Sequence, residues 1–196
     1  MRTIICLLGK SASGKDTLYH QILEAGRLPL QRVVSYTTRP QRAGEKDGLA
    51  YHFCTEIELT EFRRQGLVIE ERCYQTVAGP WHYFTLADEQ FAAVADRHLL
   101  MIATPQMVLS LRRFFGAEAV HPILVELDEG ERLSRAIARE RLQTKPNYAE
   151  VCRRFLADEE DFAPEILVQL QPCHRVRHEK TEDCIKQIED YIQSVL

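Results

Sequence analysis

The sequence predicts an α/β fold with a parallel sheet, and two observations lead to that expectation. Continuous apolar runs at 3–8, 98–103 and 121–127 lack polar alternation, which is typical of strands buried on both faces. Stretches with helical periodicity lie between and after these runs, so strands and helices alternate along the chain. Short expected strands interrupt the alternation between residues 35 and 90, where we therefore expect an inserted lobe.

The expected elements follow in order along the chain. The first half comprises a strand at 3–8, a loop at 9–14, a helix from 15 to 26, a strand at 32–35, a polar loop at 38–50, a strand at 51–54, a helix capped by Thr55 and ending at 65, and strands at 67–74 and 81–85 around a turn at Gly79–Pro80. The second half comprises strands at 98–103 and 121–127, helices rich in arginine and acids at 131–143 and 148–162, a strand at 175–178 and an amphipathic helix at 181–196.

Length and composition fit one globular domain, because 196 residues with 45% hydrophobic and 28% charged side chains can bury an ordinary core. A net charge of −4 argues against a nucleic-acid partner. We find no signal peptide and no apolar run long enough to span a membrane. The six cysteines form no C-x-x-C pair, so we expect free thiols and a cytoplasmic location. Nothing in the sequence indicates an oligomeric state.

The segment GKSASGKDT at 9–17 gives the strongest functional signal. It follows an expected buried strand and opens an expected helix, which is the context of a phosphate-binding loop, or P-loop. Gly9 and Gly14 permit backbone angles closed to other residues, and Lys15 would reach the β- and γ-phosphates of a nucleotide. We therefore expect ATP to contact Gly9, Ser11, Ala12, Ser13, Gly14, Lys15, Asp16 and Thr17.

Asp16 departs from the usual motif, which has a hydroxyl after the lysine to hold Mg²⁺. A carboxylate beside Mg²⁺ is favourable, because oxygen anions are the ligands that this ion prefers. We therefore expect Asp16 to act through the metal, directly or through water. The alternative is an outward-facing acid in the first turn of the helix.

The segment SYTTRPQRAGEKDGLAYHF at 35–53 carries two arginines, whose guanidinium groups suit a phosphate dianion. It closely resembles the guanylate kinase pattern S-x-T-T-R-x-x-R-x-G-E-x-D-G-x-x-Y-x-F. The order of P-loop, inserted lobe and arginine-rich helices resembles that family over nearly the whole chain. The resemblance implies a three-layer P-loop NTPase fold with a core at 1–34, 91–127 and 163–196, a monophosphate-binding lobe at 35–90 and a helical lid at 128–162.

The resemblance also implies an activity, the transfer of a phosphoryl group from ATP to a nucleoside monophosphate, with Mg²⁺ as cofactor. GMP or dGMP is the first candidate for the acceptor. Arg39, Arg42 and Tyr51 would bind the acceptor phosphate. Ser35 and Glu70 would contact the base, with Glu70 accepting from the guanine N1–H and amino group. Tyr83 would also touch the phosphate, Thr85 would lie near the base, and Thr104 would replace an acid that helps to read guanine.

Arginines on the two lid helices are candidates for stabilising the charge of the transition state. Arg132, Arg135 and Arg139 share one helix face at i, i+3 and i+7, and Arg153 and Arg154 lie on the next helix. The catalytic candidates are Lys15, Arg39, Arg135, Arg139 and Arg153. The alternative is a solvated face paired with nearby glutamates, and the acidic run at 158–161 is interpreted as a solvated helix end.

Two departures leave other acceptors open. The sequence has Ile102-Ala103-Thr104 where guanylate kinases carry an Asp-x-Asp pair, so negative charge near the metal would have moved to Asp16. The G-K-D-T loop also resembles those of ribose-bisphosphate kinases, phosphomevalonate kinases and phage deoxynucleotide kinases, which use other phosphorylated acceptors. A non-catalytic, phosphopeptide-binding module of the same family is a further alternative, but the intact Lys15 and glycines favour an enzyme.

Overall fold

The computed structural model describes residues 3–42, 44–76, 79–92 and 98–196. The chain divides into two compact units, Met1–Gln31 with Asp96–Leu196, and Arg32–Ala95. We call them the core unit and the acceptor unit and describe each by itself. All six cysteines are free thiols, as expected. Among the described residues, no helix is both long and apolar enough to cross a bilayer.

A five-stranded sheet forms the centre of the core unit, with the order β2-β7-β1-β8-β9. Its strands are β1 (Ile4–Leu8), β2 (Leu30–Arg32), β7 (His98–Ile102), β8 (Val120–Glu126) and β9 (His174–Arg177). β1 pairs in parallel with β7 and β8, and β9 pairs in parallel with β8. The predicted α/β fold with a parallel sheet is therefore confirmed.

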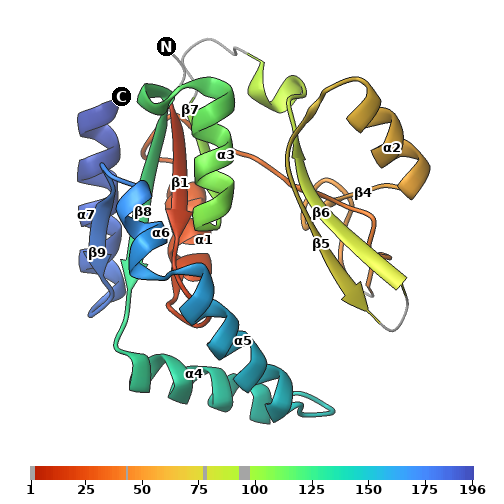
Figure 1. Cartoon of the computed structure of the whole chain (residues 1–196). Coiled ribbons are helices and arrows are strands. Elements are labelled where there is room, and N and C mark those ends of the chain that lie inside the picture. Colours follow the sequence, from red (N-terminus) through yellow and green to blue (C-terminus); the bar gives the residue numbers. More distant parts are fainter. Residues whose placement is uncertain (1–2, 43, 77–78, 93–97) are drawn as a thin grey trace. The chain divides into compact units, whose positions relative to one another are not determined.

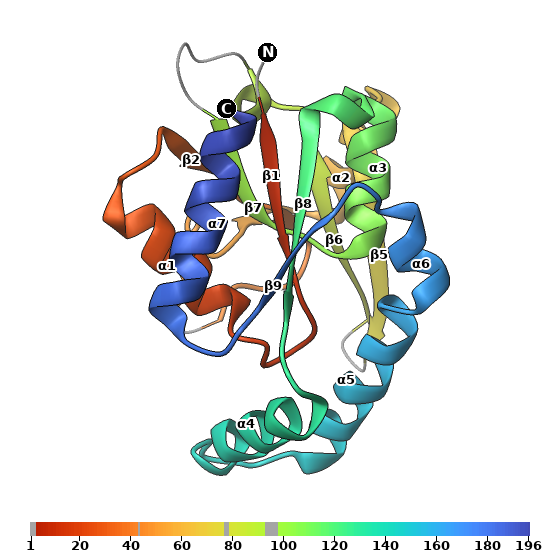
Figure 2. The same ribbon diagram turned by 90° about the vertical axis from the view of Figure 1, so that its left-hand side faces the viewer.

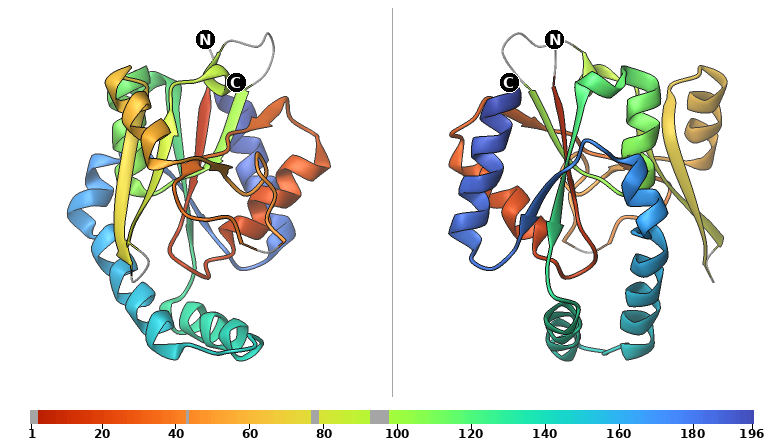
Figure 3. Two further views of the ribbon diagram at one scale, coloured as in Figure 1. Left: turned by 90° about the vertical axis from the view of Figure 1, so that its right-hand side faces the viewer. Right: turned by 60° about the vertical axis from the view of Figure 1, so that its left-hand side comes forward.

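Helices cover both faces of this sheet, which makes three layers. Figures 2 and 3 show α1 (Lys15–Ala25) and α7 (Thr181–Val195) on one face, and α3 (Pro105–Phe115) and α6 (Pro164–Gln169) on the other. α4 (Glu129–Arg141) begins shortly after β8 and contacts α5 (Tyr148–Asp161). The short 3₁₀ helix Ala117–Ala119 leads into β8.

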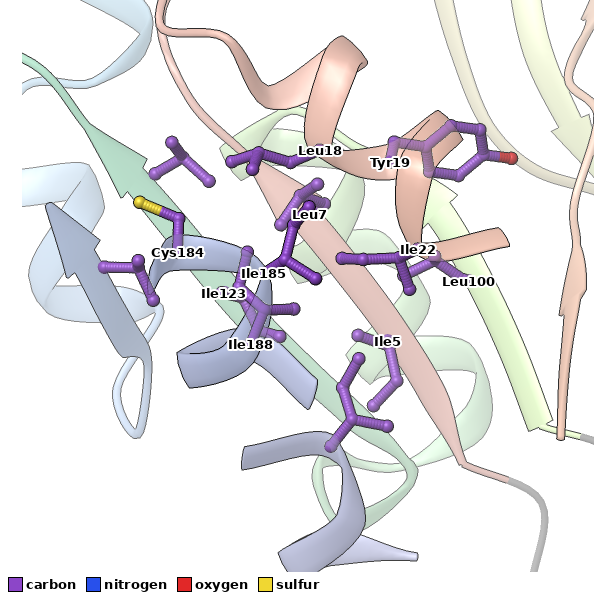
Figure 4. Close-up of a cluster of buried hydrophobic side chains, with 13 residues drawn as sticks. Ile5, Leu7, Leu18, Tyr19, Ile22, Leu100, Ile123, Cys184, Ile185 and Ile188 are labelled. Atoms are coloured by element: carbon purple, nitrogen blue, oxygen red, sulfur yellow. The ribbon is translucent and has the colours of Figure 1, made fainter. Parts of the chain in front are cut away.

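The core lies on both sides of β1, whose five residues are all buried. Ile5 and Leu7 point towards α1 and α7, where they join Leu18, Ile22 and Ile188 in one apolar cluster (Figure 4). Fully burying a side chain of this size stabilises the fold by about 1.5–3 kcal/mol. Because β1 is packed on both faces, the loop that follows it is held at a fixed edge of the sheet.

A four-stranded sheet with the order β4-β3-β6-β5 forms the acceptor unit. Its strands are β3 (Tyr36–Thr37), β4 (His52–Phe53), β5 (Val68–Thr76) and β6 (Gly79–Leu86), with α2 (Glu56–Arg64) as its helix (Figure 1). β5 and β6 pair in antiparallel fashion from Val68–Leu86 to Thr76–Gly79. Gly79 and Pro80 thus belong to β6, so the turn expected at these residues was wrong; residues 77–78 lie outside the described part. The 3₁₀ helix Glu89–Phe91 follows β6.

The two faces of this second sheet differ in character. One face carries Phe84 and Leu86, which pack with Leu59 of α2. The predicted cap of α2 is confirmed, since Thr55 and Glu58 form a reciprocal capping box. Because side chains alternate along a strand, the cross-strand pairs Glu70–Thr85 and Arg72–Tyr83 lie on the opposite face. We call this opposite face the acceptor face.

Candidate functional site

The predicted P-loop connects β1 to α1. A Cβ atom on Gly9 would lie 2.6 Å from Ser13 Oγ and 2.8 Å from the Val125 carbonyl oxygen, so a larger residue does not fit there. Gly14 precedes α1 with φ at +90°, a conformation that favours glycine. No side chain caps the first N–H groups of α1. Uncapped N–H groups at a helix N-terminus can bind an anion such as phosphate.

His178 contacts the backbone of this loop and supports it, and the sequence did not predict this contact. Its buried ring donates from Nδ1 to the Ser13 carbonyl oxygen at 2.7 Å, and its Nε2 lies 3.3 Å from Thr181 Oγ1. The ring fills the space that a Cβ on Gly14 would need. The end of β9 thus fixes the backbone of the P-loop. The only sequence signal was the position of this histidine directly after an expected strand.

A second contact joins the P-loop to α4 and α5, the helices of the expected lid, through a cluster of charged groups. Arg132, only 2% exposed, donates to Asp158 at 2.8 Å, to Glu159 at 3.0 Å and to the Ser11 carbonyl oxygen at 3.3 Å. Asp158 accepts from the Ser11 N–H at 2.9 Å. We call these residues the Arg132 cluster, whose other members are Lys10, which donates to Glu159, and Glu129, which accepts from both cations.

The Arg132 cluster corrects two expectations. The acidic run at 158–161 is not merely a solvated helix end, because Asp158 and Glu159 hold the P-loop and Arg132. Arg132 itself is buried against the Phe155 ring, with its Cζ 4.0 Å from the ring centroid, so it is not part of a solvated face, although it and Arg139 line one cavity. The sequence could not show this, because the acids that pair with Arg132 lie on another helix.

The remaining lid arginines differ in their surroundings. Arg135 pairs with Glu131 at 2.5 Å, while Arg153 and Arg154 both pair with Glu150 at 2.7 Å. Such exposed pairs contribute little to stability, so these side chains can exchange partners at small cost. A cavity of about 700 Å³ opens between α4, α5 and Ser11. Its lining includes Arg139, Arg154 and Lys145. Together with Arg132 these cations outnumber the two carboxylates of the lining, Glu140 and Glu150, so the cavity beside Ser11 carries a net positive charge.

In the acceptor unit, the predicted phosphate-binding residue Arg39 is buried and held on several sides. Its guanidinium donates to both oxygens of Glu45 at 2.8 and 3.0 Å and to the Pro40 carbonyl oxygen at 2.8 Å. Its Cζ lies 5.4 Å from the centroid of the Tyr51 ring. The Arg39 hydrogen bond lowers the pKa of the Glu45 carboxyl to about 2, so this pair stays ionised near neutral pH.

The predicted base-reading residue Glu70 lies on the acceptor face. Its side chain is 6% exposed and accepts from Thr85 Oγ1 at 3.0 Å. Burial raises the pKa of its carboxyl, and Arg72 and Thr85 oppose that shift. The Tyr51 and Tyr83 rings lie 5.6 Å apart in an edge-to-face arrangement. The acceptor unit therefore contains predicted residues from two strands, β5 and β6, and from the segments that flank β3 and β4.

The other predicted contacts have simpler environments. Arg42 is exposed, and its N–H donates to Glu45 at 2.8 Å. The Ser35 carbonyl oxygen accepts from the His52 N–H at 2.9 Å. Thr104 belongs to the core unit, where its hydroxyl caps α3 by accepting from the Met107 N–H. His82 pairs with Glu71 on the face that α2 covers.

The described residues contain no group of three or more His, Cys, Asp or Glu side chains that could hold a metal by itself. A Mg²⁺ ion that also binds nucleotide phosphates needs few protein ligands. The Asp16 carboxylate fits that requirement, since it is 64% exposed in the first turn of α1. Its Oδ2 lies 3.3 Å from Lys15 Nζ.

Comparisons with known proteins find similar sequences and a similar fold. The family model for guanylate kinase matches residues 1–78. Guanylate kinase from Chlorobium luteolum is 30% identical over 145 residues, which are 72% of this chain and 67% of the relative. The Salinibacter ruber enzyme of the same name is 34% identical over 120 residues, and the match spans 61% of each protein. The crystal structure of guanylate kinase from Anaplasma phagocytophilum has a similar fold, with a TM-score of 0.67, 18% identity and coverage of 98% of this chain and 85% of that one.

Proposed function

Because the chain belongs to the guanylate kinase family, we propose that it transfers the γ-phosphoryl group of ATP to GMP or dGMP. An oxygen of the acceptor phosphate forms the new P–O bond as the bond between the γ-phosphorus and the bridging oxygen breaks, which gives ADP and a nucleoside diphosphate. One observation carries the proposal: Glu70 and Arg39 lie in the same small unit, so one molecule with both a hydrogen-bonding base and a phosphate would engage both.

The roles of the side chains follow from their chemistry. The N–H groups of the P-loop and Lys15 hold the ATP phosphates, and Arg39, Arg42, Tyr51 and Tyr83 hold the acceptor phosphate. The lid arginines 135, 139 and 153 are candidates for neutralising the transferring group. An acceptor phosphate is already an anion, so the reaction needs no general base. Mg²⁺ would be held by Asp16 or Thr17 together with phosphate oxygens, and it would neutralise phosphate charge.

The test is ADP formation from ATP with a panel of acceptors: GMP, dGMP, IMP, AMP, CMP, UMP and ribose 1,5-bisphosphate. We expect the highest kcat/KM with GMP or dGMP and nearly complete loss of turnover in Lys15→Ala. A higher kcat/KM with ribose 1,5-bisphosphate than with any nucleotide would show that the acceptor is a sugar phosphate and not a nucleoside monophosphate. An absence of ATP binding would indicate a non-catalytic binding module instead.

A further inference from the structure

Arg72 lies on the acceptor face, although no motif in the sequence predicted a role for it. It follows Glu70 by two positions on β5 and is paired across the strands with Tyr83. Residues at i and i+2 of a strand point to the same side. Arg72 therefore shares its face with the residues that would read the base and hold the phosphate, and not with the apolar side under α2.

The guanidinium of Arg72 has unused hydrogen-bonding capacity. Its Nε is buried and lacks a hydrogen-bond partner, and it lies 3.6 Å from Glu70 Oε2, within ion-pair range but beyond hydrogen-bond length. The Arg72 side chain as a whole is 33% exposed. Within the described part of the chain its Nη groups make no hydrogen bond, in contrast to those of Arg39. An arginine that is half-buried with free donors is suited to a ligand with paired acceptors.

The Glu70–Arg72 pair presents an acceptor beside a donor, and this order matches one purine. Guanine carries the donors N1–H and N2–H next to the acceptors O6 and N7, and an arginine fork suits O6 and N7. Adenine has an amino group in place of O6, so it would direct a donor at the guanidinium. A second phosphate or carboxylate on the acceptor fits less well, because the Glu70 carboxylate would repel it.

We propose that Arg72 is a specificity-determining residue that donates to guanine O6 and N7 while Glu70 accepts from N1–H and N2–H. This inference rests on the proposed function and deepens it, since it explains how the acceptor face selects guanine over adenine. Thr85 holds the other Glu70 oxygen at 3.0 Å and so orients the carboxylate towards Arg72 and the base.

The test compares the wild type with Arg72→Met, which keeps an extended apolar side chain but removes the donors. We expect kcat/KM for GMP to fall about 10- to 100-fold, within the range for losing one bidentate contact to a base. AMP use should not fall, because the adenine amino group gains nothing from the guanidinium, so the GMP/AMP ratio falls by at least the same factor. IMP retains O6 and N7 and should lose as much as GMP. The N7-deficient analogue 7-deaza-GMP should lose less.

Two further variants make the result specific. Arg72→Lys keeps the charge without the fork and should recover only part of the GMP/AMP ratio. Arg64→Met makes the matched change on the exposed surface of α2, where Arg64 pairs with Glu61, and should leave the ratio unaltered. Thermal melts of all three variants show whether a loss of activity reflects a loss of folding.

The possible failures are distinguishable. A wild-type protein that phosphorylates no purine nucleotide contradicts the proposed function itself, before any variant is made. A wild type that uses GMP, together with an Arg72→Met variant that keeps the GMP/AMP ratio, contradicts only the role of Arg72. Equal losses for GMP and AMP contradict it as well, because they would assign Arg72 to the phosphate or to the shape of the unit.

Discussion

Asp16 is the residue at which this P-loop departs most from the common motif. Its carboxylate is well exposed and lies 3.3 Å from Lys15 Nζ, so it is accessible to a metal ion bound beside the nucleotide phosphates. A carboxylate there would neutralise the metal charge that the 102–104 segment no longer balances. If it only completed the first helical turn, its removal would cost a few tenths of a kcal/mol of stability and no metal affinity.

We predict that Asp16→Ala raises the Mg²⁺ concentration for half-maximal activity about tenfold, equivalent to about 1.4 kcal/mol, and lowers kcat. Asp16→Ser should recover part of both effects, because it restores the usual hydroxyl. Asp16→Asn keeps the shape without the charge and separates electrostatics from packing. Mg²⁺ titrations at saturating ATP measure this directly, and an unaltered Mg²⁺ dependence in Asp16→Ala would contradict the metal role.

Glu70 is the residue from which a pH dependence is expected. Burial raises the pKa of its carboxyl, so this group gains its proton earlier than an exposed glutamate as the pH falls. A protonated carboxyl no longer accepts from both guanine donors. We therefore predict that KM for GMP rises on acidification.

Glu70→Gln provides the control for this prediction. It should raise KM at neutral pH, because an amide mismatches one of the two donors, and it should remove the part of the pH dependence that comes from Glu70. Titration of the GMP phosphate affects both proteins, so the difference between their KM profiles isolates the carboxyl. Parallel profiles for wild type and variant would assign the pH dependence to the substrate alone.

At the scale of elements, the Arg132 cluster ties α4 and α5 to the P-loop. Arg132 is almost fully buried, so its charge needs the acids around it. Removing one partner of a buried ion pair costs more than an exposed pair contributes, because the remaining charge stays desolvated. Glu129 and Glu159 would still pair with Arg132 when Asp158 is replaced, which reduces the loss.

We predict that Asp158→Ala lowers the free energy of unfolding by about 2–3 kcal/mol, somewhat less than the roughly 3–5 kcal/mol for a buried charge left without any partner. Glu131→Ala, which breaks an exposed pair on α4, should change it by less than about 0.5 kcal/mol. Urea denaturation measures both. A double-mutant cycle with Arg132→Met should give a coupling energy of about 0.5–3 kcal/mol, and a value near zero would contradict a cooperative cluster.

The elements also show what the sequence could and could not predict. Hydrophobic runs and caps located β1, β8, α2 and α7 within a few residues, because local periodicity specifies buried strands and amphipathic helices. The hairpin of β5 and β6 was recognised but its turn was misplaced, since Gly79 and Pro80 look like turn residues yet pair within the ladder. α6 was missed because six residues are too few for periodicity to show.

Contacts between segments that are distant in the chain could not be predicted from the sequence for a different reason. The hydrogen bond from His178 to Ser13 joins residues 165 positions apart, and the pairs of Arg132 with Asp158 and Glu159 join two helices. No local pattern encodes such pairings. Arg72 could have been found, because the alternation of β5 places it beside Glu70, but an arginine on a strand is usually a solvated side chain.

At the scale of the whole molecule, the two proposed sites belong to separate units, with the P-loop in the core unit and the Arg39–Glu70 face in the acceptor unit. A ligand that binds only the folded protein adds stability according to its own affinity and concentration. At a hundredfold excess over Kd that gain is about 2.7 kcal/mol. For a chain of this length it corresponds to a rise of roughly 5–10 °C in the apparent Tm.

We predict that mutations separate these two stabilising effects. Lys15→Ala should abolish most of the Tm rise caused by ATP but retain the rise caused by GMP, because Lys15 lies in the core unit. Arg39→Ala should do the reverse, although breaking its pair with Glu45 will also lower the starting Tm, so each shift is read against the ligand-free variant. Thermal melts with each nucleotide alone make the comparison. If Arg39→Ala lost both shifts while remaining folded, Arg39 would not be a dedicated acceptor residue, and a site that needs both units for either ligand would replace the two-site description.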